Sequence, residues 1–322
     1  MTNSGLEEIA KVLNRCKRAA ITCHVRPDGD ALGSGLALCL ALRNAGKEAY
    51  MICEDEVPER LAIFPAMSLV SRSLPVSFAE LDLFISVDVA DVSRMGVFAS
   101  DYASFKGTTL NIDHHISNQG FGRYNYVLPD STATCEIIPE VLNAANFEIT
   151  EEIANLLAMG LLTDSGNFSH NDVSAKTFAV ASMLRAKGAD TCRIGYLMFT
   201  RQTRGRAILF GKALSRLRFA LDGKLAFINI TQKDFEDTGT DKSHTEGFVD
   251  YALSIDEVEV SVSLLEVRKN QYKASLRSKK ANVNAVASTF GGGGHVLASG
   301  CMLFGELEEV IDRLTYAVYQ QL

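Results

Sequence analysis

Residues 1–187 alternate short apolar runs with helical patterns, and this alternation constrains the fold more than any other feature of the sequence. Strands that alternate with helices form a parallel sheet covered on both faces. We therefore predict an α/β domain with a doubly wound, mainly parallel sheet over residues 1–187. The runs with the length and composition of buried strands are residues 19–24, 48–53, 81–88 and 108–112.

Helical periodicity separates these strands. One further helix is expected after the loop that ends at Asp30, whose side chain can cap it, and this helix should end at Gly46. Thr150 precedes two glutamates and is expected to be an N-cap. The other predicted helices of this domain are residues 5–17, 131–145, 150–162 and 174–187.

The pattern changes after residue 187. Residues 188–214 read as an arginine-rich helical linker, with a solvated helix as the plain alternative. Two hairpin signals follow, one around Asp222-Gly223 and one around Asn270. Residues 215–322 are therefore predicted to be a smaller α+β domain with a mixed sheet, with helices near 246–254, 282–289 and 307–321.

Charge and cysteine usage restrict the class of partner. The 322-residue chain has a formal net charge of −7, which argues against a broad basic face for long duplexes but allows a short nucleotide at one point. Seven dispersed cysteines without a Cys-x-x-Cys pair indicate reduced thiols in a cytoplasmic protein. No apolar run reaches 18 residues, so no membrane partner is expected. The oligomeric state is open, and a homodimer is possible.

Acidic and imidazole side chains gather where strands and helices end. Asp113-His114-His115 closes one predicted strand, and ligands of α/β sheets bind outside such carboxyl ends. Aspartates there are often only caps and turn residues, but four acidic loops at such ends are harder to explain in that way. The remaining members of the group are His24, Asp28, Asp30, Asp88 and Asp164.

This group has the composition of a two-metal site. Four of its aspartates lie in loops and together carry a charge of about −4, which balances two divalent cations; they are Asp28, Asp30, Asp88 and Asp164. Histidines beside carboxylates favour Mn²⁺, with Mg²⁺, Fe²⁺ and Co²⁺ also possible. Two such cations suit the hydrolysis of a phosphoester, because together they stabilise the attacking and leaving oxygens.

Five motifs carry a resemblance to a known family. They are His24-x-x-Pro-Asp-Gly-Asp30, Val87-Asp-x-x-Asp-x-x-Arg-x-Gly96, Asp113-His-His-x-x-Asn118, Thr163-Asp-Ser-Gly-x-Phe168 and Gly291-Gly-Gly-Gly-His-x-x-Ala-Ser-Gly300. With these motifs the chain resembles the DHH/DHHA1 phosphoesterases, and among them the NrnA-like nano-RNases that also dephosphorylate 3′-phosphoadenosine 5′-phosphate (pAp). Ser165 stands where relatives often carry threonine.

The resemblance implies a role for each acidic motif. One Mn²⁺ would be held by His24, Asp28 and Asp88. The other would be held by Asp30, Asp88, His114 and Asp164, so that Asp88 bridges the two ions. His115 would face the scissile phosphate, and Asp113 would orient the histidines as the other catalytic residue.

The C-terminal motif is expected to bind the substrate. Four consecutive glycines, Gly291, Gly292, Gly293 and Gly294, let backbone N–H groups approach a phosphate closely. His295, Ser299 and Arg277 would contribute beside them, and the guanidinium matches phosphate oxygens. A flexible loop is the alternative for the glycines, and a solvated strand end is the alternative for Arg277.

The expected activity is hydrolysis of short single-stranded RNA, down to dinucleotides, to mononucleotides, together with conversion of pAp to AMP. The first alternative is a phosphodiesterase for cyclic or linear di-adenylate. A catalytically silent nucleotide-binding protein is the alternative from outside the enzymes, and loss of any ligand in the motifs would have favoured it.

Overall fold

The computed structural model describes residues 3–322. The chain forms two compact units that divide between Arg201 and Gln202. The segment predicted as a linker is shared between them. Helix α7 (Thr191–Gly195) and a π-helical turn (Tyr196–Thr200) belong to the first unit, and α8 (Arg204–Ser215) belongs to the second.

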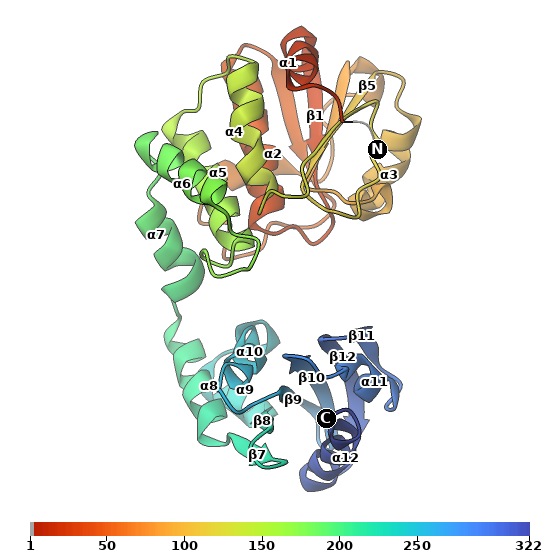
Figure 1. The fold of residues 1–322 in the computed structure, drawn as a ribbon, viewed down its shortest axis with the longest axis vertical. Helices are drawn as coiled ribbons and strands as arrows, with labels where there is room; N and C mark the ends of the chain where they lie inside the picture. Colours follow the sequence, from red (N-terminus) through yellow and green to blue (C-terminus); the bar gives the residue numbers. More distant parts are fainter. Residues whose placement is uncertain (1–2) are drawn as a thin grey trace. The chain divides into compact units, whose positions relative to one another are not determined.

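The first unit contains a six-stranded sheet in the order β3-β2-β1-β4-β5-β6, and all pairs are parallel (Figure 1). This confirms the predicted doubly wound sheet. Two strands were not predicted, β3 and β6, which are short. The strands are β1 (Arg18–Thr22), β2 (Glu48–Ile52), β3 (Val70–Ser71), β4 (Leu83–Val87), β5 (Thr108–Asp113) and β6 (Tyr124–Val127).

Helices cover both faces of this sheet (Figure 1). One face packs on the larger core with α1, α2, α4 and α5, and the other packs around Phe84 with α3 and 3-10 turns. Close packing of α2 on α5 requires Gly33, where a Cβ atom would lie 2.6 Å from the Leu156 carbonyl oxygen. The helices are α1 (Leu6–Arg15), α2 (Gly29–Asn44), α3 (Ala99–Ser104), α4 (Thr134–Ala144), α5 (Glu151–Asp164) and α6 (Ala175–Ala186).

The start of α2 corrects one prediction. Asp28, rather than Asp30, is the N-cap, and its Oδ1 accepts hydrogen bonds from the backbone N–H groups of Asp30 (3.0 Å) and Ala31 (3.1 Å). Asp30 lies inside the first turn and is buried. Gly29 precedes it because a side chain there would overlap Thr163 of α5. The capping residue thus leaves Asp30 free for another contact.

The strand order places a switch point between β1 and β4. The chain runs outward from β1 through β2 to β3 and then returns to β4 on the other side of β1. At such a point the connections leave the sheet in opposite directions, which opens a crevice outside the carboxyl ends of the strands. β1, β4 and β5 all end at this edge.

The second unit is built on a mixed six-stranded sheet, as predicted. Its order is β11-β12-β10-β9-β8-β7, and only the β8–β9 pair is parallel. Both predicted hairpins form, whereas β11, β12 and α9 were not predicted. The strands are β7 (Arg218–Ala220), β8 (Leu225–Ile230), β9 (Val260–Arg268), β10 (Gln271–Ser278), β11 (Gly293–His295) and β12 (Ala298–Phe304).

The helices of the second unit leave part of this sheet uncovered. One face packs against α11 and α12, whereas α8 and α10 pack on the β8–β9 part of the other face. α10 also reaches the end of β10, where Asp250 pairs with Arg277. The β10–β12 part of that second face carries Lys273 and Met302, which are exposed. The helices are α8, α9 (Gln232–Thr238), α10 (Phe248–Leu253), α11 (Val283–Ser288) and α12 (Leu307–Tyr319).

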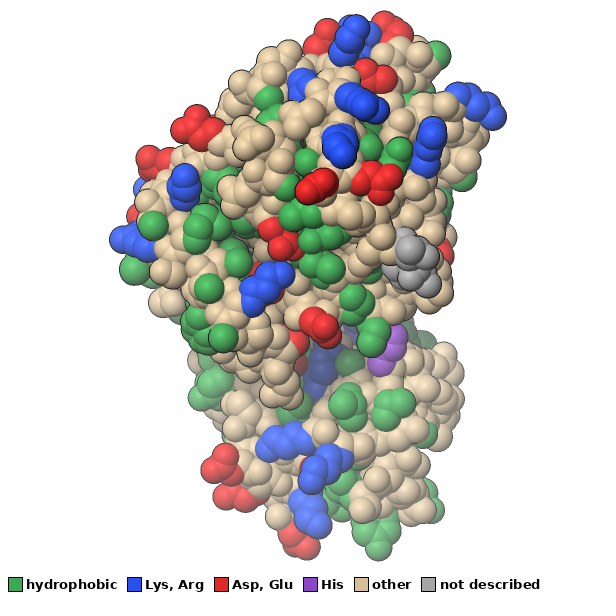
Figure 2. Space-filling model, turned by 45° about the horizontal axis from the view of Figure 1, so that its top comes forward, with side chains coloured by type: hydrophobic (Ala, Val, Ile, Leu, Met, Phe, Trp, Pro, Cys, Tyr) green, Lys and Arg blue, Asp and Glu red, His purple; other side chains and the backbone are tan. Residues whose placement is uncertain are grey.

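Charged side chains are mixed on the surface. On the face drawn in Figure 2, basic and acidic groups are interspersed among polar and apolar ones.

Within residues 3–322, no helix combines the length and the apolar character that a membrane span needs.

Candidate metal centre and nucleotide-binding surface

The predicted acidic motifs converge at the carboxyl edge of the first sheet. His24 follows β1, Asp88 follows β4, and the two histidines follow β5. Asp88 has a φ of 56°, a left-handed conformation that is uncommon outside glycine, and its N–H bonds the Ile112 carbonyl oxygen at 3.0 Å. Such a backbone outlier at a strand end is typical of functional sites. It turns the carboxylate across the end of the sheet.

The side chains form overlapping groups in which the potential ligand atoms lie within 4.8 Å of one another. Asp88 belongs to two of the groups, and His114 also belongs to two. The groups are His24 with Asp28 and Asp88, Asp30 with His114 and Asp164, and Asp88 with His114 and His115. The structure therefore brings all six predicted metal ligands together.

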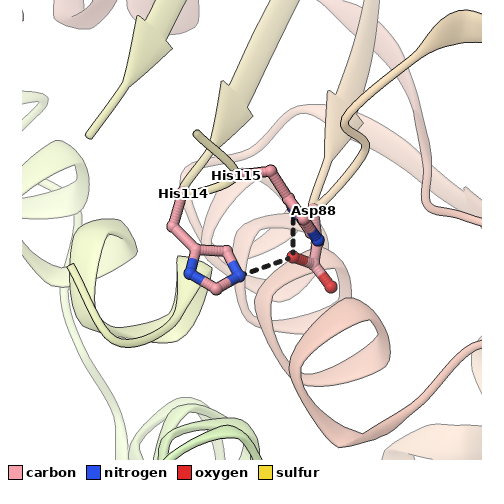
Figure 3. Close-up of side chains that lie close together, drawn as sticks. All are labelled: Asp88, His114 and His115. Carbon is pink, nitrogen blue, oxygen red and sulfur yellow. Dashed lines mark ion pairs between the residues drawn. The ribbon is translucent and has the colours of Figure 1, made fainter. Parts of the chain in front are cut away.

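Asp88 forms ion pairs with both His114 and His115 (Figure 3). Its Oδ2 is 3.4 Å from His24 Nε2, whereas its Oδ1 is 3.5 Å from His114 Nε2. The same Oδ1 is 3.7 Å from His115 Nδ1. Its two oxygens thus face different imidazoles, which is the arrangement needed for a carboxylate that bridges two ions.

Backbone carbonyls fix the orientation of two imidazoles. His24 Nδ1 lies 2.9 Å from the Val25 carbonyl oxygen, and His114 Nδ1 lies 3.1 Å from the Ser131 carbonyl oxygen. A carbonyl only accepts, so both Nδ1 atoms carry the proton. Nε2 is then the ring nitrogen that remains to bind a metal ion, and on both residues it lies near an oxygen of Asp88. Metal-binding histidines are oriented in this way in proteins.

His115 differs from the other two histidines. Its Nδ1 donates to Asp113 Oδ1 at 2.8 Å, and its side chain is 40% exposed. Asp113 is fully buried, and its Oδ2 accepts a 2.6 Å bond from Asn118 Nδ2. Asp113 therefore fixes the orientation of the His115 ring. It belongs to none of the potential metal-binding groups among the described residues.

The N-terminus of α4 binds Asp30, and the sequence did not reveal this contact. Asp30 Oδ2 accepts the Thr134 N–H at 2.6 Å, and Oδ1 accepts the Cys135 N–H at 2.8 Å. No side chain of its own chain neighbours caps α4, so Asp30 does so from α2. The Thr134 hydroxyl also donates to Asp88 Oδ1 at 3.1 Å. A threonine inside the predicted helix 131–145 gives no signal of such a role.

The carboxylates of the cluster repel one another. Burial, together with the neighbouring Asp30 and Asp88, raises the pKa of Asp164 to about 8. Burial and the charge of Asp88 likewise raise the pKa of Asp30 well above its usual value. Burial lowers the pKa of His24, but hydrogen bonds with Asp28 and Asp88 outweigh this and raise it to about 10.

In the described part of the chain, histidine is the only cationic side chain that pairs with these carboxylates. Within residues 3–322, no Lys or Arg forms an ion pair with the buried carboxylates Asp30 and Asp88 or with the half-buried Asp164. Crowded carboxylates with two free imidazole nitrogens are the donor set of a divalent cation. The residues present therefore fit the metal site that the sequence predicted.

Two arginines at this cavity were not assigned a role from the sequence. The cavity has a volume of about 360 Å³, and Arg26 and Arg94 line it together with His24, Asp28, Asp88, His114, His115 and Asp164. Both arginines are exposed. His170 is exposed, and its Nδ1 donates to the Asp164 carbonyl oxygen at 2.7 Å.

In the second unit, the structure places only part of the predicted substrate-binding set on one face. Arg277 of β10 lies opposite Ala298 of β12, which lies opposite His295 of β11. Residues directly opposite in a sheet share a face, so Arg277 and His295 lie on the same face, together with Gly293. Arg277 also bonds the Leu276 carbonyl oxygen (3.0 Å) and lies 3.5 Å from Asp250 Oδ1.

Ser299 belongs to the other face. Alternation along β12 turns its side chain toward α11, where its hydroxyl donates to the Val283 carbonyl oxygen at 2.6 Å. It is 6% exposed. The side chain therefore supports α11 and does not lie beside Arg277 and His295.

The last two of the four glycines lie in an edge strand, and the first two lie in the turn before it. Gly293 and Gly294 pair with β12 in β11. A Cβ atom at Gly292 would lie 2.2 Å from the Gly300 carbonyl oxygen, and Gly294 has a φ of 153°. Gly291 has a φ of 73°, whereas a Cβ atom at Gly293 would meet only Asn284 Oδ1, at 3.7 Å. Packing or backbone conformation thus accounts for three of these glycines, and only Gly293 is left without such a reason.

Comparison with known proteins agrees with this architecture. The DHH family, N-terminal domain, matches residues 18–161, and the DHHA1 domain matches residues 222–322. A bifunctional oligoribonuclease and PAP phosphatase, NrnA, from Thermus thermophilus is 32% identical over 309 residues, which cover 94% of this chain and 89% of that protein.

Two further relatives are informative. The crystal structure of an exopolyphosphatase-related protein from Bacteroides fragilis is similar with a TM-score of 0.84 at 28% identity, covering 98% of this chain and 95% of that chain. The cyclic-di-AMP phosphodiesterase GdpP from Bacillus subtilis is 28% identical over 96% of this chain, but the match covers only 49% of that protein. Both domains, their order and the convergent acidic motifs place the chain in the DHH/DHHA1 family of phosphoesterases, among its NrnA-type members.

Proposed function

We propose that the protein is a two-metal phosphoesterase that hydrolyses short oligoribonucleotides to mononucleotides and pAp to AMP. The observation that carries this proposal is the cluster around Asp88, which combines crowded carboxylates and oriented imidazoles, and in which no Lys or Arg of the described residues forms an ion pair with Asp30, Asp88 or Asp164. The names of the NrnA relatives, which cover nearly the whole chain, supply the substrate class.

The cluster suggests how the metal ligands divide. His24, Asp28 and Asp88 would hold one ion, and Asp30, Asp88, His114 and Asp164 would hold the other. When bound, two such cations supply Lewis acidity toward the phosphoryl oxygens. Imidazole ligands beside the carboxylates favour Mn²⁺.

The remaining side chains act on the substrate. The Nδ1–H of His115 is hydrogen-bonded to Asp113, so its Nε2 is available to the scissile phosphate group. Asp113 holds the ring in that orientation and favours its protonated form. Removing one preorganised group of this kind typically costs an enzyme about 10²–10³ in kcat.

The second unit would recognise the nucleotide. The half-buried Arg277 and the exposed His295 lie on one face of its sheet, beside the N–H groups of the β11 edge. Guanidinium and backbone N–H groups are typical ligands of a phosphate. Ser299 would contribute only through α11.

A cyclic or linear di-adenylate phosphodiesterase is the second candidate, because GdpP shares both domains with this chain. The chain matches about half of that protein. The NrnA relatives match over nearly their full length and favour the first candidate.

The test compares kcat/KM with Mn²⁺ for a 5′-phosphorylated RNA dinucleotide, a long single-stranded RNA and pAp. We expect efficient cleavage of the dinucleotide and of pAp, and weak action on the long strand. Preference for cyclic di-adenylate would favour the second candidate. Absence of hydrolysis in protein that binds two Mn²⁺ would contradict the proposed activity and point to a silent nucleotide-binding protein.

A further inference from the structure

We propose that Arg26 and Arg94 bind the non-bridging oxygens of the scissile phosphate and that they make the site favour a phosphomonoester over a phosphodiester. The inference rests on the proposed function, because it assigns the balance between the two activities of one site. It concerns residues of the first unit only.

Both guanidinium groups are free to accept a ligand. Each arginine lines the same cavity of about 360 Å³ as the candidate metal ligands. Neither side chain has a hydrogen-bond or ion-pair partner within the described part of the chain, residues 3–322. Three carboxylates line this cavity, yet they face the histidines instead. An unpaired guanidinium at a polar cavity is matched by phosphate oxygens, which it binds in a bidentate manner.

The backbone holds the two arginines side by side. Arg26 has a φ of 55°, and its N–H donates to Asp55 Oδ2 at 2.6 Å. The next contact joins the two loops, because the Val25 N–H donates to the Arg94 carbonyl oxygen at 2.7 Å. A left-handed arginine is held in place only where surrounding contacts determine it. These contacts bring the loops after β1 and β4 together at the switch point of the sheet.

Charge then distinguishes the two substrate classes. A phosphomonoester carries a charge of about −1.5 to −2 near pH 7 and has three non-bridging oxygens. A phosphodiester carries only about −1, and its second ester group replaces one of those oxygens. Two cationic forks therefore match the monoester better. Removing one fork should weaken binding of the monoester more than binding of the diester.

The experiment uses two substrates that differ only at the scissile group. pAp and the dinucleotide pApA share the 5′-phosphorylated adenosine, and pApA carries a second nucleoside on the scissile phosphate. We would measure kcat/KM for both with Mn²⁺ in the wild type, Arg26→Gln, Arg94→Gln and the double variant. Arg123→Gln is the control, because Arg123 is exposed and does not line the cavity.

We expect the ratio of kcat/KM for pAp to that for pApA to fall several-fold in each single variant and at least about tenfold in the double variant. Arg94→Lys keeps the charge without the fork and should fall between the wild type and Arg94→Gln. The melting temperature and the number of Mn²⁺ ions bound per chain should stay unchanged, as should both activities of Arg123→Gln.

Different failures give different results. Equal losses on both substrates, or a larger loss on pApA, would overturn the assignment of the arginines while leaving the proposed function intact. Unchanged ratios in the double variant would overturn it in the same way. A wild-type protein that hydrolyses neither substrate would instead overturn the proposed function, and the inference with it.

Discussion

Both units bury carboxylates, but they balance the charge in opposite ways. In the second unit, Asp234 is 2% exposed and pairs with Arg216, with Lys212 3.4 Å away. In the first unit, Asp30 and Asp88 are equally buried, but within residues 3–322 no Lys or Arg pairs with them. The second unit is thus electrostatically complete on its own, whereas the first leaves negative charge for a ligand to balance.

The pKa values follow this contrast. Burial raises the pKa of Asp234, but its bonds to Arg216 and Thr231 outweigh this and hold the pKa well below its usual range. For Asp164, burial and neighbouring carboxylates act together and raise the pKa to about 8. A buried carboxylate that the protein does not neutralise is costly. Such a cost is retained where the site serves function.

The largest effect is expected at Asp88. Asp88→Ala removes the carboxylate that faces both imidazoles, so it should abolish the binding of both ions and reduce kcat/KM by more than about 100-fold. Metal content per chain and hydrolysis of a dinucleotide measure the two effects. Asp312→Ala, at an exposed position of α12, is the matched control. Near wild-type activity in Asp88→Ala would show that the cluster around Asp88 does not take part in hydrolysis.

Asp113 tests the difference between a metal ligand and a residue that only orients a neighbour, because it accepts a hydrogen bond from His115 and lies in none of the potential metal-binding groups of the described residues. In the wild type, one oxygen of Asp113 accepts from His115 and the other accepts from Asn118. Asp113→Asn replaces one of these oxygens with an amide N–H₂, which cannot accept, so the His115 ring is held less well in its orientation. We expect kcat to fall about 10- to 100-fold, as for other groups that orient metal-site residues, with metal content unchanged. Loss of metal along with activity would show that Asp113 is itself a ligand.

Arg216 tests whether the second unit depends on its own cation. Arg216→Met leaves Asp234 buried beside Lys212 alone, and we expect a loss of about 1–3 kcal/mol in the free energy of unfolding. Chemical denaturation at pH 7 measures it. Arg218→Met is a control, because Arg218 pairs with the exposed Glu308. A similar loss in both variants would mean that burial of Asp234 is unimportant.

The pH dependence of this pair has a definite sign. The pKa of Asp234 is lower in the folded protein than in the unfolded chain, where it is about 3.9. Its contribution to stability is therefore complete above about pH 4 and is lost as the pH falls further. Asp234→Asn should show less of this acid destabilisation than the wild type, and an unchanged acid profile would contradict the pairing.

Asp164 provides the opposite test in the first unit. In metal-free protein, Asp164→Asn replaces a carboxyl group whose ionisation is disfavoured by burial and by neighbouring carboxylates, so we expect the free energy of unfolding to rise by about 1 kcal/mol or more. With Mn²⁺ present, the wild type should become the more stable of the two. Thermal melting with EDTA and with Mn²⁺ compares them. A destabilised variant under both conditions would indicate that the carboxylate is a structural residue.

The smallest effect is expected at Gly293, on the exposed edge of the second unit. A Cβ atom there has room, so Gly293→Ala should change the free energy of unfolding by no more than about 0.5 kcal/mol. If the β11 backbone approaches the substrate phosphate, KM should rise several-fold with kcat unchanged. An unchanged KM would leave His295 and Arg277 to bind the nucleotide without the backbone.

The sequence predicted the parts of the fold that repeat a simple pattern. β1, β2, β4 and β5 are apolar runs of ordinary length, and all were found. The two-residue β3 and the polar β6 carry no such pattern and depend on their neighbours in the sheet. β12 begins with Ala298-Ser-Gly, which has low strand propensity, and it forms because β10 and β11 pair with it.

The sequence predicted the charged residues of the site, but it did not predict the contacts that depend on how the helices pack. The acidic motifs point to their convergence because strand ends meet at one edge of a sheet. The part played by Thr134 and the cap of α4 by Asp30 arise from the approach of α2 to α4, which no local pattern records. Ser299 was misplaced because its motif neighbours face the other side of β12, which strand alternation would have revealed had β12 been recognised.

The cap of α4 by Asp30 also sets an order of events during synthesis of the chain. Asp30 and Thr134 are 104 residues apart, and Asp164 comes later still. A chain emerging from the ribosome therefore exposes its first acidic loop long before its partners exist, and domains fold as units once their chain is complete. The nascent protein gains its ion-binding pocket only after α5 has been made. Truncated products that stop before this helix should lack the proposed ion-binding site, because Asp164 at the end of α5 is missing from them.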